Sequence, residues 1–113
     1  QLILELHDKN NQISDIIKEK VILDAPLQIE GTNSFIPIHT IVTPKKIIAG
    51  NNSATALRIK DQLVEMYGGN SGDWQKVVGV VESDAYLFDI HWYRDSRIGK
   101  NKGFKIKSKK RKE

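Results

Sequence analysis

The hydrophobic pattern of this chain changes period once, and that change limits the folds it can adopt. From Ser53 to Tyr67 the apolar residues recur at helical spacing, and Gly68 is placed to end a helix. From Trp74 onward apolar and polar residues alternate, which is typical of strands with one buried face. The sequence therefore predicts one principal helix followed by an antiparallel sheet.

The alternating part divides into three strands. Trp74 to Glu82 and Tyr86 to Tyr93 are predicted to be strands joined by a tight turn at Ser83 to Ala85. A loop from Asp95 to Lys102 is predicted to precede a third strand from Gly103 to Ser108.

The first 50 residues give a weaker pattern, and we expect them to be largely irregular. A short helix is predicted from Ser14 to Lys20, and a short strand from Ile38 to Val42, after which Pro44 ends the strand or begins a turn of helix. Residues 109–113 are expected to form a solvated basic tail. We therefore expect a single α+β domain of 113 residues, with one or two helices packed on an antiparallel sheet of three to five strands.

Composition excludes several kinds of chemistry. The chain has no cysteine, so disulfides and thiol catalysis are excluded, and three scattered histidines argue against a zinc site. We expect neither a metal nor another cofactor. The longest stretch without charge, residues 31–44, is short and contains two prolines, so we expect no membrane-spanning segment.

Charge is unevenly distributed along the chain. The net charge is +4, but residues 1–93 carry −4 and residues 94–113 carry +8. A dense cationic end of this kind is typical of proteins that bind nucleic acid, because lysine and arginine neutralise phosphates. A nucleic acid is therefore an expected partner.

The strand expected from Tyr86 to Tyr93 separates a polar face from an apolar one. Asp89, His91 and Tyr93 share the polar face, and the apolar face is expected to pack on the helix. Matching the apolar faces of the neighbouring strands places Lys105 opposite His91, Lys107 opposite Asp89, and Gly79 beside Asp89.

This polar face carries the groups that RNA cleavage without a metal requires: a base, an acid and cations that stabilise the charge on phosphorus. The candidate catalytic residues are His91, Tyr93, Asp89, Lys105 and Lys107. His39 and Thr43 are candidates for a second acid–base group or phosphate ligand. The expected RNA-binding residues, with Arg94 at the rim of the face, are Arg94, Lys100, Lys102, Lys109, Lys110 and Arg111.

The stretch from Trp74 to Lys107, with WQKVVGVVESDAYLFDIHWYR and the later GFKIK, resembles toxin domains of bacterial polymorphic and contact-dependent inhibition systems. More specifically, it resembles nucleases of the barnase–EndoU–colicin–RelE-like (BECR) fold, which carry a ribonuclease site on the open face of a sheet. The resemblance implies a ribonuclease toxin that acts on tRNA and is neutralised by an acidic immunity protein. It also implies delivery into a target cell's cytoplasm as the C-terminal part of a larger secreted protein, which fits a start at Gln1.

Two other functions stay open from the residues alone. One is a non-catalytic nucleic-acid-binding module in which the basic end contacts phosphates and an aromatic side chain stacks on bases. The other is an interaction domain whose basic tail binds an acidic partner.

Overall fold

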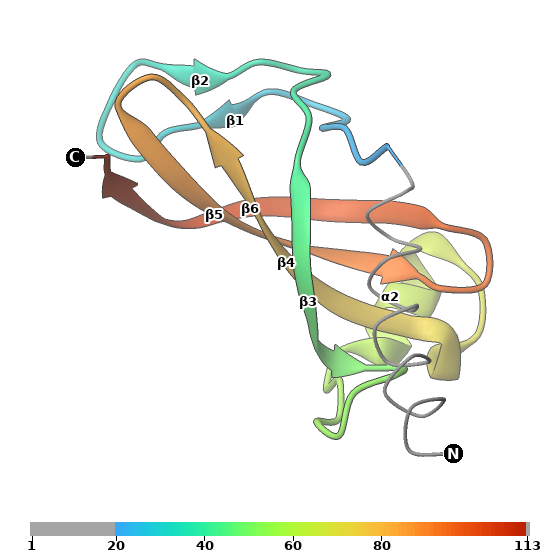
Figure 1. The fold of residues 1–113 in the computed structure, drawn as a ribbon. Coiled ribbons are helices and arrows are strands. Elements are labelled where there is room, and N and C mark those ends of the chain that lie inside the picture. The colour runs from blue at the N-terminus through green and yellow to red at the C-terminus, as the bar shows by residue number, and fades with distance from the viewer. Residues whose placement is uncertain (1–19, 113) are drawn as a thin grey trace.

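The computed structural model describes residues 20–112 and shows an α+β fold with one α-helix in that range (Figure 1). Four strands form an antiparallel sheet in the order β3-β4-β5-β6, and a separate pair, β1 and β2, forms a small second sheet. No helix in this range is long and apolar enough to span a membrane. The elements are β1 (Leu27–Gln28), β2 (Phe35–Ile36), β3 (Thr43–Gly50), α2 (Lys60–Tyr67), a 3₁₀ turn η1 (Ser71–Asp73), β4 (Trp74–Glu82), β5 (Tyr86–Asp95) and β6 (Lys100–Arg111).

Helix α2 ends where the sequence predicts but begins later. Gly68 takes a left-handed φ of 90°, and its amide donates a hydrogen bond of 2.7 Å to the Val64 carbonyl. The predicted start at Ser53 is wrong, because the Ser53 hydroxyl accepts a hydrogen bond from the Thr55 amide within a local turn. Serine side chains compete with helix formation in this way, so the helix begins only at Lys60.

The three strands predicted after the helix are confirmed, although two of them are longer than expected. β5 continues to Asp95, and β6 begins at Lys100, so the connection between them is short. The predicted free tail is wrong, because Lys109–Arg111 pair with Tyr86–Phe88 of β5. Beyond the strand, the Lys112 ammonium lies 2.9 Å from the Glu82 carboxylate.

The sequence analysis does not predict β3, which lies within the part of the chain expected to be irregular. Pro44 was expected to end a strand, but it lies inside β3. β3 is an edge strand, so a proline, which has no backbone N–H, is tolerated there. The pairing register of β3 with β4 also shifts next to this proline, between Pro44 and Lys46. Of the strand predicted from Ile38 to Val42, Ile41 makes one isolated bridge, to Ile22. The helix predicted from Ser14 lies outside the described residues, apart from Lys20.

The main core lies between the four-stranded sheet and the chain segment 21–42, which we call the N-terminal layer. Phe88, Ile90 and Trp92 of β5 point into this core. The expectation that α2 covers this face is wrong, since the covering side chains are Val21, Leu23, Ile36 and Val42.

Helix α2 instead packs against the end of the sheet where β4 begins and β5 ends (Figure 1). Its Leu63 joins a second buried cluster with Ala49, Leu57 and Trp74. Because Trp74 pairs with Asp95, this cluster closes one end of the sheet and leaves the middle of the second face uncovered by the helix.

Candidate nucleic-acid interface

The face of the four-stranded sheet that points away from the N-terminal layer is called the open face below. Its central row of side chains crosses all four strands. Lys46 of β3 pairs with Val78, Val78 pairs with His91, and His91 pairs with Lys105. The predicted pairing of His91 with Lys105 is therefore confirmed. Side chains directly opposite one another in such a ladder have Cβ atoms about 5 Å apart, so the Lys105 stem adjoins the imidazole.

A second row lies beside the first and contains Asp89. Here the predicted pairing of Asp89 with Lys107 is wrong, because β6 has an extra residue between its partners of Asp89 and Ile90. Ser108 therefore lies opposite Asp89, and its hydroxyl donates a 2.6 Å hydrogen bond to the carboxylate. Thr43, through Val80, lies in this same row on the far strand.

Gly79 does not open the face beside Asp89, so that expectation is wrong. From Val77 to Val81 of β4 the buried residues are Val77, Gly79 and Val81, which places Gly79 on the core side. A Cβ atom on Gly79 would lie 2.9 Å from Cη2 of Trp92. The glycine therefore leaves space for the indole ring, while Val78 lies on the open face.

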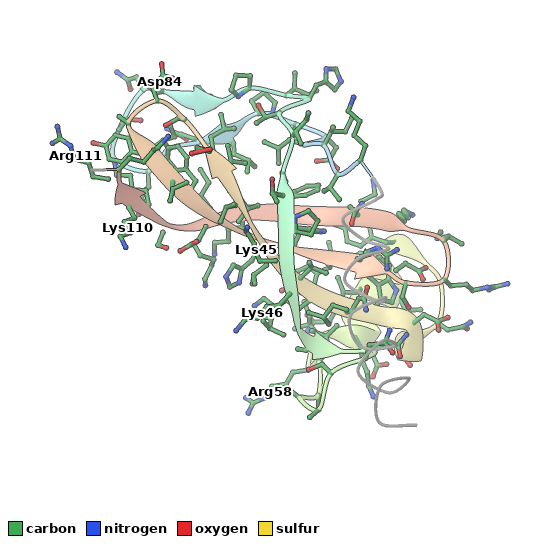
Figure 2. All side chains as sticks on the ribbon, viewed as in Figure 1. Lys45, Lys46, Arg58, Asp84, Lys110 and Arg111 are labelled. Carbon is green, nitrogen blue, oxygen red and sulfur yellow. The ribbon has the colours of Figure 1, made fainter. Side chains whose placement is uncertain are left out.

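A cavity of about 320 Å³ lies over the centre of the open face. Its cations Lys45 and Lys46 come from β3, and the sequence analysis does not identify them because Pro44 predicts the end of a strand there. Figure 2 shows both lysines on β3, at the opposite edge of the sheet from β6. The residues that line it are Lys45, Lys46, Ile48, Val78, Gly79, Val80, Asp89 and His91.

The surroundings of His91 favour its uncharged form. Burial lowers the pKa of the imidazole below its ordinary value of 6.5, and the charges of Lys76 and Lys107 lower it further. Asp89 acts in the opposite direction without reversing the shift. The Nδ1 atom of His91 is buried and has no hydrogen-bond partner among the described residues. The other nitrogen, Nε2, is therefore the atom available for chemistry in the cavity.

Tyr93 lies at the boundary between the open face and the second buried cluster. It is partly buried against that cluster, and the Lys76 ammonium lies 5.9 Å from the centre of its ring. Gly103, with a left-handed φ of 71°, accommodates the ring, since a Cβ there would lie 3.1 Å from Cδ2 of Tyr93. Tyr93 therefore shares the face with His91, beside the part that the cluster occupies.

Arg94 does not lie at the rim of the open face, so the sequence expectation about its position is wrong. Its side chain is only 6% exposed, and Nη1 donates a 2.8 Å hydrogen bond to Oε1 of Gln75. Arg94 follows Trp92 by two residues and thus shares the core side of β5. Strict use of the alternation would have placed it there.

The ammonium groups of Lys100 and Lys102 both contact Tyr67, the last residue of α2. The Lys100 ammonium donates a 3.0 Å hydrogen bond to the Tyr67 carbonyl, and the Lys102 ammonium lies 5.9 Å from the centre of the Tyr67 ring. Cations near the last carbonyls of a helix stabilise its C-terminus. These two lysines therefore hold the helix at the sheet end.

The last cations of β6 divide between the two faces. Lys109 lies on the core side, with its ammonium 5.1 Å from the centre of the Tyr86 ring. Figure 2 shows Lys110 and Arg111 leaving β6 in opposite directions, so Lys110, which pairs with Leu87, belongs to the open face.

His39 lies in the turn before β3, where its amide donates a hydrogen bond to the Leu23 carbonyl. It therefore belongs to the N-terminal layer and does not join His91.

Two findings concern metals and relatives. Within residues 20–112 no group of three or more histidine, aspartate or glutamate side chains could hold a metal ion. No protein-family model, curated protein or solved structure matches the chain.

Proposed function

We propose that the chain is a metal-independent ribonuclease whose active site is the central row of the open face. One observation carries this proposal: a histidine whose pKa is lowered by burial and by the charges of Lys76 and Lys107 lies directly opposite Lys105. A general base must be unprotonated at the working pH, and a transferring phosphoryl group needs cations beside it. His91 and its lysines supply both in one place.

The reaction uses these groups in a fixed order. His91 accepts the proton of a ribose 2′-hydroxyl while that oxygen attacks the adjacent phosphorus. The bond from phosphorus to the 5′-oxygen breaks, and that oxygen takes a proton from the Lys105 ammonium or the Tyr93 hydroxyl. The products are a 2′,3′-cyclic phosphate and a 5′-hydroxyl. The ammonium groups of Lys46 and Lys107 offset the negative charge that accumulates on the phosphoryl oxygens.

The biological part of the proposal rests on the resemblance to BECR toxin domains. In this part of the proposal the substrate is tRNA, and the ribonuclease acts inside a competing bacterial cell. It reaches that cell as the C-terminal part of a larger secreted protein. In the producing cell, an acidic immunity protein covers the cationic face. The surplus of cations on β6 supports this partner, because opposed charge accelerates association.

A second candidate, RNA binding without cleavage, is favoured by the unpartnered Nδ1 of His91. Catalytic histidines commonly donate one ring N–H to a fixed acceptor, which leaves the other nitrogen free to accept a proton. Here an N–H at Nδ1 would be buried without an acceptor, so the tautomer with the proton on Nε2 is favoured. That form donates a hydrogen bond to a phosphate and is a poor base.

One experiment separates the two candidates. The purified domain is incubated with total bacterial RNA in EDTA, beside a His91→Asn variant, and the RNA ends are analysed for cyclic phosphate. Cleavage by the wild type alone supports the ribonuclease. Salt-sensitive binding by both proteins without cleavage assigns the non-catalytic function. Cleavage that requires added magnesium contradicts a metal-independent mechanism.

A further inference from the structure

Strand β6 is a free edge of the main sheet. Its twelve residues pair with β5 on one side, and within residues 20–112 no strand pairs with it on the other. Alternate residues of such an edge direct their N–H and C=O groups outward, where another strand can pair with them. β1 lies near this edge but belongs to the separate small sheet.

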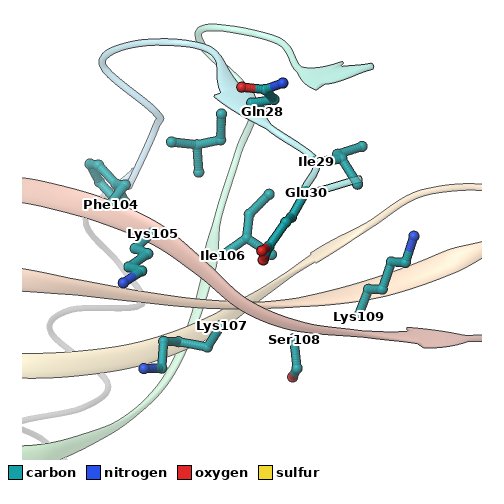
Figure 3. A pocket seen from close by; sticks show the side chains of 10 residues that line it. Gln28, Ile29, Glu30, Phe104, Lys105, Ile106, Lys107, Ser108 and Lys109 are labelled. Atoms are coloured by element: carbon teal, nitrogen blue, oxygen red, sulfur yellow. The ribbon is translucent and has the colours of Figure 1, made fainter. Parts of the chain in front are cut away.

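A groove of about 490 Å³ runs between β1 and this edge (Figure 3). Leu27 and Ile29 contribute apolar side chains from one wall, and Phe104 and Ile106 contribute them from the other. Glu30 also lines the groove. The β6 part of the lining is the continuous stretch 104–109, so the groove follows the edge for six residues.

The two sides of β6 differ sharply in character along this stretch. In Figure 3, Phe104, Ile106 and Lys109 extend toward β1, whereas Lys105 and Lys107 extend to the other side, which is the open face. β6 carries seven lysine or arginine residues and no aspartate or glutamate. A strand added at this edge would therefore meet the apolar side chains of the groove on one side and the ammonium groups of Lys105 and Lys107 on the other.

We propose that the outer edge of β6 binds an extended acidic segment of a partner protein, which adds a fifth strand to the sheet. Backbone hydrogen bonds to residues 104–109 would hold the segment in place. Its side chains would alternate, with apolar residues in the groove and aspartate or glutamate beside Lys105 and Lys107. The bound segment occupies the lysines next to His91, and the expectation that it inhibits cleavage rests on the proposed function.

The groove favours a polypeptide over RNA at this edge. A nucleic acid would use the cations but would leave the outward N–H and C=O groups and the apolar side chains of the groove unused. Lysines on an edge strand also discourage aggregation. That role alone explains neither the apolar wall that β1 provides nor the position of Lys105 and Lys107 on the side of β6 opposite the groove.

The test uses a fluorescent ten-residue peptide of alternating glutamate and valine, with fluorescence anisotropy for binding and amide hydrogen exchange for location. We expect binding to wild type, and protection of amides within residues 104–109. Lys105→Glu with Lys107→Glu should weaken binding at least tenfold. Arg58→Glu with Lys60→Glu makes the same change in net charge on exposed residues before and at the start of α2, and should leave the affinity within twofold.

Two N-methylated peptides test the backbone pairing, one methylated at the valine amides and the other at the glutamate amides. One of them should lose at least tenfold in affinity, because it cannot donate hydrogen bonds toward β6. Equal binding by all three peptides would show ionic attraction only and would overturn the proposal. Protection of the same amides by a single-stranded oligouridylate, with none by the peptide, would make the groove an RNA site and would also overturn it. None of these measurements depends on RNA cleavage.

Discussion

Gly79→Ala tests whether β4 presents its glycine to the core or to the open face. In the structure a Cβ atom at this position would clash with the Thr43 carbonyl oxygen and would lie 2.9 Å from Cη2 of Trp92. The Thr43 contact is with the backbone of the neighbouring strand, so it cannot be relieved by rotating a side chain. We therefore expect the variant to fold with a clear loss of stability.

The size of the loss follows from two opposed effects. Replacing a strand glycine by alanine stabilises by about 0.5–1 kcal/mol where space allows, because the unfolded chain loses freedom. Overpacking a closely packed core costs about 1–3 kcal/mol, and here two rigid neighbours resist the added methyl. We expect a net loss of about 2 kcal/mol in the free energy of unfolding. For a domain of this size that corresponds to a fall of roughly 8–12 °C in Tm.

Urea and thermal unfolding followed by circular dichroism measure this change. Gly72→Ala is the matched control, because a Cβ there would have no atom within 4 Å and the backbone is not left-handed. It should stay within about 0.5 kcal/mol of wild type. A Gly79→Ala variant as stable as this control would refute the placement of Gly79 against Trp92. It would instead favour a glycine on the open face.

Three further predictions follow from the polar residues. His91→Asn should abolish RNA cleavage in a gel assay while changing the free energy of unfolding by less than about 1 kcal/mol, since the ring lies outside both buried clusters. Because the pKa of His91 is lowered on folding, the unfolded chain binds its proton at higher pH. Wild-type stability should therefore fall as pH drops from about 6.5 through the lowered folded value, and this fall should be smaller in the His91→Asn variant. Arg94→Met should cost about 1–3 kcal/mol in urea unfolding, because Gln75 loses a buried partner, yet leave RNA affinity unchanged; weaker binding by the folded variant would contradict the buried position.

The alternation of β5 and its close connection to β4 made much of the sheet predictable. A short turn joins these strands, and the apolar residues of β5 mark its buried side, so the face that carries Asp89 and His91 followed from the sequence. Arg94 could have been placed correctly by the same rule, because it shares the parity of Trp92.

Other features depend on tertiary pairing that local patterns do not encode. Pro44 is compatible with β3 only because that strand lies at the edge, and nothing in the local sequence shows which strand is the edge. The buried side of β4 was misassigned because valine occupies positions 77, 78, 80 and 81, so hydrophobicity did not distinguish its two faces. The partner of the β5 apolar face was also missed, since residues 21–42 show no regular period.

The extra residue of β6 beside Ser108 contributes to the electrostatics of His91. With regular pairing Lys107 would lie opposite Asp89, and the two charges would largely neutralise one another. The bulge instead places Ser108 opposite Asp89. The Ser108 hydroxyl donates a 2.6 Å hydrogen bond to one oxygen of the Asp89 carboxylate. Lys107 then remains among the charges that lower the pKa of His91. The residue inserted between the partners of Asp89 and Ile90 therefore separates Lys107 from the carboxylate, and this lysine adds to the lowering of the His91 pKa that burial and Lys76 produce.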